Sequence, residues 1–80
     1  MHVAVELSLY PLTDTFIPPI LDFIERLNAR PGLAVVTNSM STQVSGEFNV
    51  VFDALRAEIA ATLEGDHRAV FVMKVLGGGA

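Results

Sequence analysis

Apolar residues alternate with small or polar ones across residues 3–9, a spacing that indicates a strand with one buried face. Pro11 is expected to end this strand, because proline has no N–H to donate to a sheet. Residues 13–15 offer hydroxyl and carboxylate groups that cap helices. Apolar positions then recur at helical spacing from Ile17 to Leu27, with two prolines that fit only the first turn. The pattern therefore predicts a strand followed by an amphipathic helix.

The second half of the chain again shows strand spacing followed by helix spacing. Residues 33–36 and 40–45 predict two strands joined by a short turn, and Gly46 is expected to break the pattern. Apolar residues then step by four from Val51 to Leu63, which indicates a second helix. Residues 69–76 form a last strand that is apolar on both faces, as in strands buried on both sides.

The predicted order is β-α-β-β-α-β, which is the ferredoxin-like α+β pattern. It implies a four-stranded antiparallel sheet with two helices on one face, and nothing in the chain to cover the other face. We expect residues 1–76 to form one domain and residues 77–80 a flexible glycine-rich tail. Hydrophobic residues make up 51% of the chain, and the mean hydropathy is +0.49. We therefore expect a homo-oligomer, a dimer or tetramer, paired through sheet faces.

Charge and composition exclude several functions. The net charge of −4 disfavours nucleic-acid binding, which needs a basic surface. No apolar run approaches the roughly 20 residues of a membrane-spanning helix, so we expect no membrane insertion and a cytoplasmic location. Without cysteine the chain has no disulfide or thiolate site. His2 and His67 stand alone, so we expect no metal site and no metal cofactor. No serine has a histidine or lysine close in sequence to activate it, which makes an enzyme the least expected class.

Residues 37–43, TNSMSTQ, form a polar segment between apolar ones and carry no charged side chain. Hydroxyl and amide groups of this kind can recognise a small molecule by hydrogen bonds. In a hairpin, however, Thr, Asn and Ser more often form turns through bonds to the backbone. Composition alone favours the turn, and both interpretations remain open.

Two segments, ELSLYPLTDTFIPPIL and TNSMSTQVSGEFNVVFDAL, resemble the YkoF-like thiamine- and hydroxymethylpyrimidine-binding family, and the resemblance runs from Val3 to Val75. It implies a ferredoxin-like domain that binds the aminopyrimidine part of thiamine without turning it over. It also implies that two such domains pair through their sheets. Since this chain holds one copy, the pairing would join separate chains.

An aminopyrimidine is a flat ring with hydrogen-bonding groups at its rim, so its site requires polar groups around an apolar slot. Hydroxyl and amide groups could form the rim, and Tyr10, Phe16 or Met40 could form the flat surface. An aromatic face or Glu47 would be a suitable neighbour for the positive thiazolium of thiamine. The expected ligand-binding residues are Ser8, Tyr10, Phe16, Thr37, Asn38, Met40, Ser41, Thr42 and Glu47.

Each of these residues also has a structural interpretation. Met40 could fill the core, and Glu47 would favour a helix N-terminus with or without a ligand. Glu6 and Lys74 could form a cross-strand ion pair. The alternative to a binding protein is a structural or regulatory interaction module that associates through its sheet and binds no small molecule.

Overall fold

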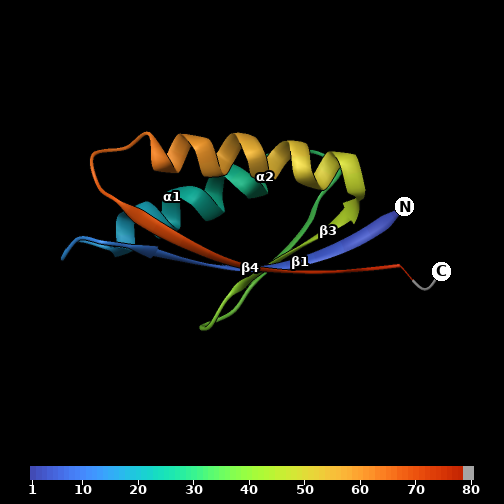
Figure 1. The fold of residues 1–80 in the computed structure, drawn as a ribbon, viewed down its shortest axis with the longest axis horizontal. Helices are drawn as coiled ribbons and strands as arrows, with labels where there is room; N and C mark the ends of the chain where they lie inside the picture. The colour runs from blue at the N-terminus through green and yellow to red at the C-terminus, as the bar shows by residue number, and fades with distance from the viewer. Residues whose placement is uncertain (79–80) are drawn as a thin grey trace.

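In the computed structural model, which describes residues 1–78, the elements follow the predicted order (Figure 1). The elements are β1 (His2–Pro11), α1 (Ile17–Asn28), β2 (Ala34–Thr37), β3 (Thr42–Glu47), α2 (Phe48–Leu63) and β4 (Ala69–Gly77). The strands form one antiparallel sheet in the order β2-β3-β1-β4. Both helices lie on one side of this sheet (Figure 1). The predicted ferredoxin-like fold is confirmed.

The core lies between the helices and the two central strands. The apolar side chains that alternate along β1 point toward the helices, and Val5 keeps only 1% of its surface exposed. Apolar residues from β3 and both helices complete this layer. The buried cluster consists of Val3, Val5, Leu7, Phe23, Leu27, Val44, Val51 and Leu55.

The first strand ends at Pro11, as predicted, and Pro11 is itself the last residue paired with β4, opposite Ala69. Other predicted boundaries were wrong, for local reasons. Residues 13–15 do not cap α1: Phe16 holds the N-cap position and makes no side-chain cap bond. The third strand begins at Thr42 rather than at residue 40, because Met40 and Ser41 belong to the turn.

Gly46 does not break the third strand. It pairs with Val3, and β3 continues to Glu47. A side chain at position 46 would place its Cβ 2.9 Å from the carbonyl oxygen of Gly32, so glycine permits a close approach of two backbones. Glu47 is the N-cap of α2, and its carboxylate accepts a hydrogen bond of 3.1 Å from the Val50 N–H.

A charged cluster joins the two helices beside the core. Glu58 of α2 is 9% exposed, and its carboxylate accepts bonds from Arg26 at 2.9 Å and Arg30 at 2.7 Å. Arg26 also donates to the Thr62 hydroxyl at 2.8 Å and forms an ion pair with the Asp22 carboxylate at 3.1 Å. The paired charges hold α1 against α2, and they explain how a carboxylate is tolerated at a buried position.

The sheet face away from the helices is not covered by any other part of residues 1–78. Val36, Val70, Val72 and Leu76 lie on it with 45–75% of their surfaces exposed. Glu6 and Lys74 form the expected cross-strand ion pair on this face, at 3.7 Å. β4 is an edge strand, so Val75, on its helix side, is also 52% exposed. Of the predicted tail, Gly77 is the last residue of β4, and residues 79–80 lie outside the described part.

Candidate functional site

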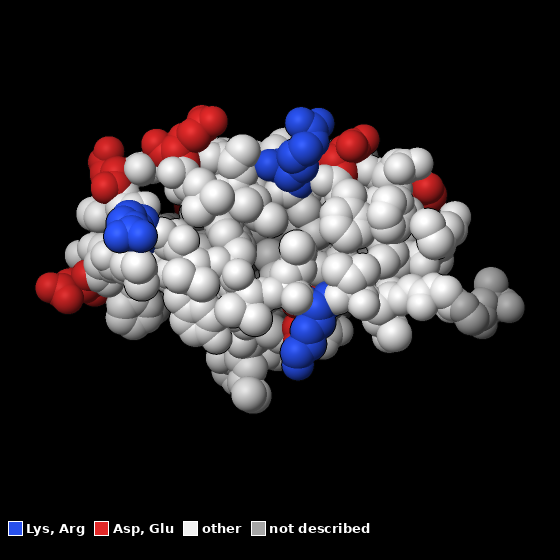
Figure 2. All heavy atoms as spheres, in the orientation of Figure 1, with Lys and Arg blue, Asp and Glu red and all other residues white. Residues whose placement is uncertain are grey.

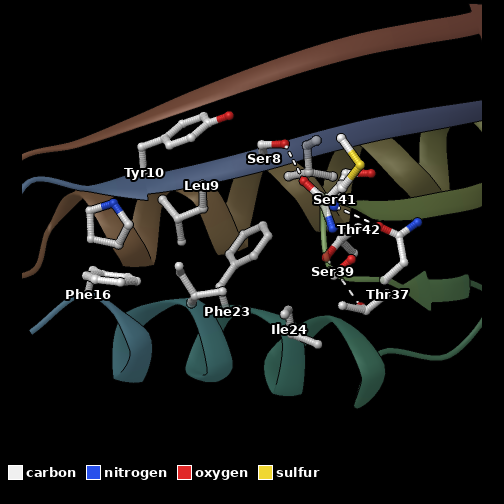
Figure 3. Close-up of a pocket in the computed structure, with 15 residues that line it drawn as sticks. Ser8, Leu9, Tyr10, Phe16, Phe23, Ile24, Thr37, Ser39, Ser41 and Thr42 are labelled. Atoms are coloured by element: carbon white, nitrogen blue, oxygen red, sulfur yellow. Dashed lines mark hydrogen bonds between the residues drawn. The ribbon is translucent and has the colours of Figure 1, made fainter.

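A pocket of about 350 Å³ lies where β1 ends, between the first half of α1 and the tip of the β2–β3 hairpin (Figure 3). Leu9 points from β1 toward α1, whereas Ser8 and Tyr10 lie on the other side of the strand (Figure 3). The hairpin closes the remaining side with residues 37–42. Three segments that are distant in sequence therefore meet around one hollow.

The wall on the helix side is apolar. Phe16, Ile20, Phe23 and Ile24 provide it from α1 and from the residue before it. Phe23 is held from behind: its ring centroid lies 5.1 Å from that of Phe71 at an interplanar angle of 56°, a favourable tilted arrangement. The guanidinium of Arg26 also sits 5.9 Å from the Phe23 ring centroid. These contacts hold the Phe23 ring in place as part of the apolar wall.

Asn38 shapes the hairpin tip. Its side-chain oxygen accepts hydrogen bonds from the backbone N–H groups of Met40, at 2.8 Å, and of Ser41, at 3.0 Å. The Asn38 N–H donates to the Ser41 carbonyl at 3.0 Å. This is the side chain–backbone pattern of an Asx turn, so the structural interpretation of Asn38 is correct for its oxygen. Within residues 1–78 no hydrogen bond engages its amide NH₂, which is available beside the pocket.

Two threonines face each other where the hairpin leaves the sheet. Thr37 and Thr42 are cross-strand partners, and their hydroxyl oxygens lie 3.3 Å apart. Thr42 is only 6% exposed, while Thr37 is exposed. Each hydroxyl thus has a protein partner in the free protein and still lines the pocket.

Two serines link the pocket to the open sheet face. The Ser8 hydroxyl donates to the Met40 carbonyl at 3.3 Å, which ties the hairpin to β1. The Ser41 hydroxyl donates to Glu6 at 3.3 Å. The pocket lining itself contains no charged residue. In Figure 2 charged side chains gather along the helical side, and the projecting hairpin tip carries none.

The structure brings most of the predicted site residues to this pocket but leaves one outside. The residues that line it are Ser8, Tyr10, Phe16, Thr37, Asn38, Met40, Ser41 and Thr42. Glu47 does not line it: it pairs with His2 at the opposite end of the β1–β3 ladder and caps α2. Met40 does not fill the core, since it is 86% exposed at the hairpin tip.

The sequence did not single out several other lining residues, which are Leu7, Leu9, Pro11, Ile20, Phe23, Ile24 and Ser39. Most are apolar residues at strand or helix spacing, and that spacing does not distinguish a core position from a pocket wall. The one available signal was Pro11, since proline in a strand often marks an edge with no neighbouring strand.

A second hollow, of about 220 Å³, lies between the two helices and the start of β4. Arg26 lines it, but that side chain is engaged with Asp22, Glu58 and Thr62. Within residues 1–78, no group of three or more acidic, histidine or cysteine side chains is arranged to hold a metal ion. In the same residues, no helix is long and apolar enough to cross a membrane.

The sequence of the chain matches a known family. Residues 2–73 fit the YKOF-related family, and the chain belongs to it. No curated protein matches the chain in sequence.

Solved structures share the fold over nearly the whole chain. A hypothetical protein from Methanocaldococcus jannaschii is 25% identical, with a TM-score of 0.80 over 96% of this chain and 80% of that one. A protein from Streptococcus pneumoniae is 22% identical, with a TM-score of 0.87 over 98% and 88% of the two chains. A candidate thiamine biosynthesis/salvage protein from Thermotoga maritima is 18% identical, with a TM-score of 0.84 over 98% and 85%.

Proposed function

We propose that this protein binds thiamine, or its hydroxymethylpyrimidine part, without chemical conversion, for carriage, buffering or sensing. The observation that carries the proposal is the pocket at the end of β1, which combines an apolar wall with an uncharged hydrogen-bonding rim. Its volume of about 350 Å³ lies at the small end of the range for ligand sites, as a single substituted pyrimidine requires. Phe16 and Phe23 offer aromatic surface, and Thr37, Thr42 and Asn38 offer donors and acceptors.

Two comparisons support this ligand class. The chain belongs to the YKOF-related family, and one protein with the same fold is described as a candidate for thiamine biosynthesis or salvage. The positive thiazolium of thiamine would extend toward Glu6, the carboxylate that bonds Ser41. Glu6 thereby takes the role first assigned to Glu47, which lies at the far end of the strand.

Calorimetry with three ligands tests the proposal. Hydroxymethylpyrimidine and thiamine should bind more tightly than thiamine diphosphate, because the lining has no Lys or Arg to meet a phosphate and the chain is acidic. Added salt should weaken thiamine binding only slightly, since hydrogen bonds and stacking dominate over screened charge. Absence of binding by all three ligands, or tighter binding of the diphosphate, would overturn the proposed function.

The alternative function is a structural or regulatory interaction module with no small ligand. The open sheet face favours it, because exposed apolar residues such as Val72 and Leu76 are typical of interaction surfaces. A module of this kind would bind a protein partner and take up none of the three ligands. Under either function, we propose a cytoplasmic homo-oligomer paired through this face.

A further inference from the structure

One edge of β1 is only partly occupied. On that edge the pairing with β3 ends at Leu7 and Thr42, whereas on the other edge the pairing with β4 continues to Pro11 and Ala69. Residues 8–11 of β1 therefore have a neighbouring strand on one side only. Their free edge borders the pocket, which all four of them line.

The direction of the backbone groups on this edge follows from the bonds at the two ends of β1. The Met1 carbonyl accepts from the Phe48 N–H, at 2.8 Å on the β3 edge, and the Leu12 N–H donates to the Arg68 carbonyl, at 2.8 Å on the β4 edge. In an antiparallel sheet a residue's N–H and C=O lie on the same edge, and successive residues alternate. The odd-numbered residues of β1 therefore face β3, and both backbone groups of Leu9 face the pocket.

The hairpin turn removes the residue that would have paired with Leu9. Continuing the β1–β3 register would place Met40 opposite Leu9. Instead the Met40 N–H donates to the Asn38 side chain at 2.8 Å, and its carbonyl accepts from the Ser8 hydroxyl at 3.3 Å. Within residues 1–78 neither the N–H nor the C=O of Leu9 has a hydrogen-bond partner. Pro11, which faces the same edge, has no N–H at all.

We propose that the backbone N–H and C=O of Leu9 are the groups that recognise the aminopyrimidine, a proposal that rests on the function proposed above. A 4-aminopyrimidine carries a ring nitrogen, which accepts, next to an exocyclic amino group, which donates. This side of the ligand ring can bond the N–H and the C=O of Leu9 at the same time. The ligand would then take the place that the next residue of β3 would occupy if that strand were longer. Main-chain groups at a sheet edge bind extended peptides in this way.

This position also orients the ring. A ligand that continues β3 lies in the plane of the sheet, so one of its faces meets Phe23 and Ile24 on the helix side. The other face is turned toward Met40 and the open side of the sheet, where Glu6 lies. The arrangement selects for an amino group: a 4-dimethylamino analogue has no N–H to donate and leaves the Leu9 carbonyl unpaired. Sites built around a hydrogen bond discriminate strongly against ligands that lack it.

Amide hydrogen exchange on the intact protein tests the proposal directly, with hydroxymethylpyrimidine as the probe and NMR as the readout. The Leu9 amide should exchange freely without ligand and at least about tenfold more slowly when the ligand saturates the protein. The Leu7 amide is the matched control, since it pairs with Thr42 and should be protected in both states. The same spectra show whether the amides of the hairpin respond to the ligand at all.

Two variants of Leu9 give a second measurement. Leu9→Pro removes the N–H without breaking a bond between strands, and should weaken binding about three- to tenfold or more. Leu9→Val also shortens the side chain but keeps the N–H, so it should bind at least about threefold more tightly than Leu9→Pro. Hairpin amides that respond while the Leu9 amide stays unprotected would overturn this inference and leave the proposed function standing. No response from any pocket amide would overturn both. Should Leu9→Pro not fold, the exchange measurement decides alone.

Discussion

At the scale of single residues, the polar side chains of the hairpin form its turn and also line the pocket. Asn38 forms the turn through its side-chain oxygen, and the same residue borders the pocket. The hydroxyls of Thr37 and Thr42 bond each other and also line the hollow. A residue can therefore build the free structure and still be available to a ligand, because a hydroxyl both donates and accepts.

The threonine pair allows the two roles to be separated. Thr37→Val alone leaves the hydroxyl of Thr42, a 6% exposed residue, without its partner and should cost about 1 kcal/mol of unfolding free energy. The double change to Val removes both hydroxyls and leaves neither unpaired. Its unfolding free energy, measured by urea unfolding, should therefore lie close to that of the natural protein. Its affinity for hydroxymethylpyrimidine should nevertheless fall about tenfold. Normal binding by the double variant would show that these hydroxyls are structural only.

At the scale of elements, the step from β3 into α2 shows how one residue ends a strand and begins a helix. Glu47 is the last residue of β3, where it pairs with His2, and its carboxylate caps α2 by accepting a bond from the Val50 N–H. Glu47→Ala should destabilise the protein by about 1 kcal/mol, whereas Glu47→Asp should keep most of the cap. Thermal unfolding measures both variants.

The same variant also checks where the site lies. Glu47 is at the opposite end of the β1–β3 ladder from the pocket, so Glu47→Ala should leave the affinity for thiamine unchanged. A marked loss of thiamine affinity in a folded Glu47→Ala protein would contradict the placement of the site at the end of β1.

At the scale of the whole molecule, the open sheet face carries apolar residues that nothing within residues 1–78 covers. β4 offers a matched pair of positions to examine it, because Val72 and Val75 have the same residue type and are both 52% exposed. Val72 is cross-strand partner to Ser8 on the open face, and Val75 to the core residue Val5 on the helix side. The two side chains therefore lie on opposite faces of the sheet.

We expect light scattering at micromolar concentration to find a dimer or larger assembly of the natural chain. Val72→Glu should shift it toward monomer, because an unpaired charge in an apolar interface is costly, while Val75→Glu should not. A natural chain that is monomeric under these conditions would remove the case for pairing through the sheet face. Equal effects of the two substitutions would locate the contact at the edge of β4 instead.

The hydrophobic pattern was enough to predict the order of the elements, and sequence resemblance was enough to predict the family. The alternation along β1 correctly predicted which of its residues face the helices. The spacing from Ile17 to Leu27 predicted α1 but not its full buried face, since Phe23 is 2% exposed while Ile17 is 51% exposed. This pattern did not predict the burial of Glu58, because its two arginine partners are distant in sequence: Arg26 lies in α1 and Arg30 lies just after that helix.

The position of the pocket and most of its apolar lining depend on the assembled fold. Phe23 and Ile24 have the spacing of core residues, and they become a pocket wall because β3 stops two residues short of Leu9. Glu47 is close in sequence to the polar hairpin, but it lies at the other end of β3 from the hairpin. Glu6 is distant in sequence, yet strand pairing places it within hydrogen-bond distance of Ser41. The unpaired backbone of Leu9 has no signature in its side chain. Which strand edges remain open depends on how far each neighbour extends, and that is a property of the assembled sheet.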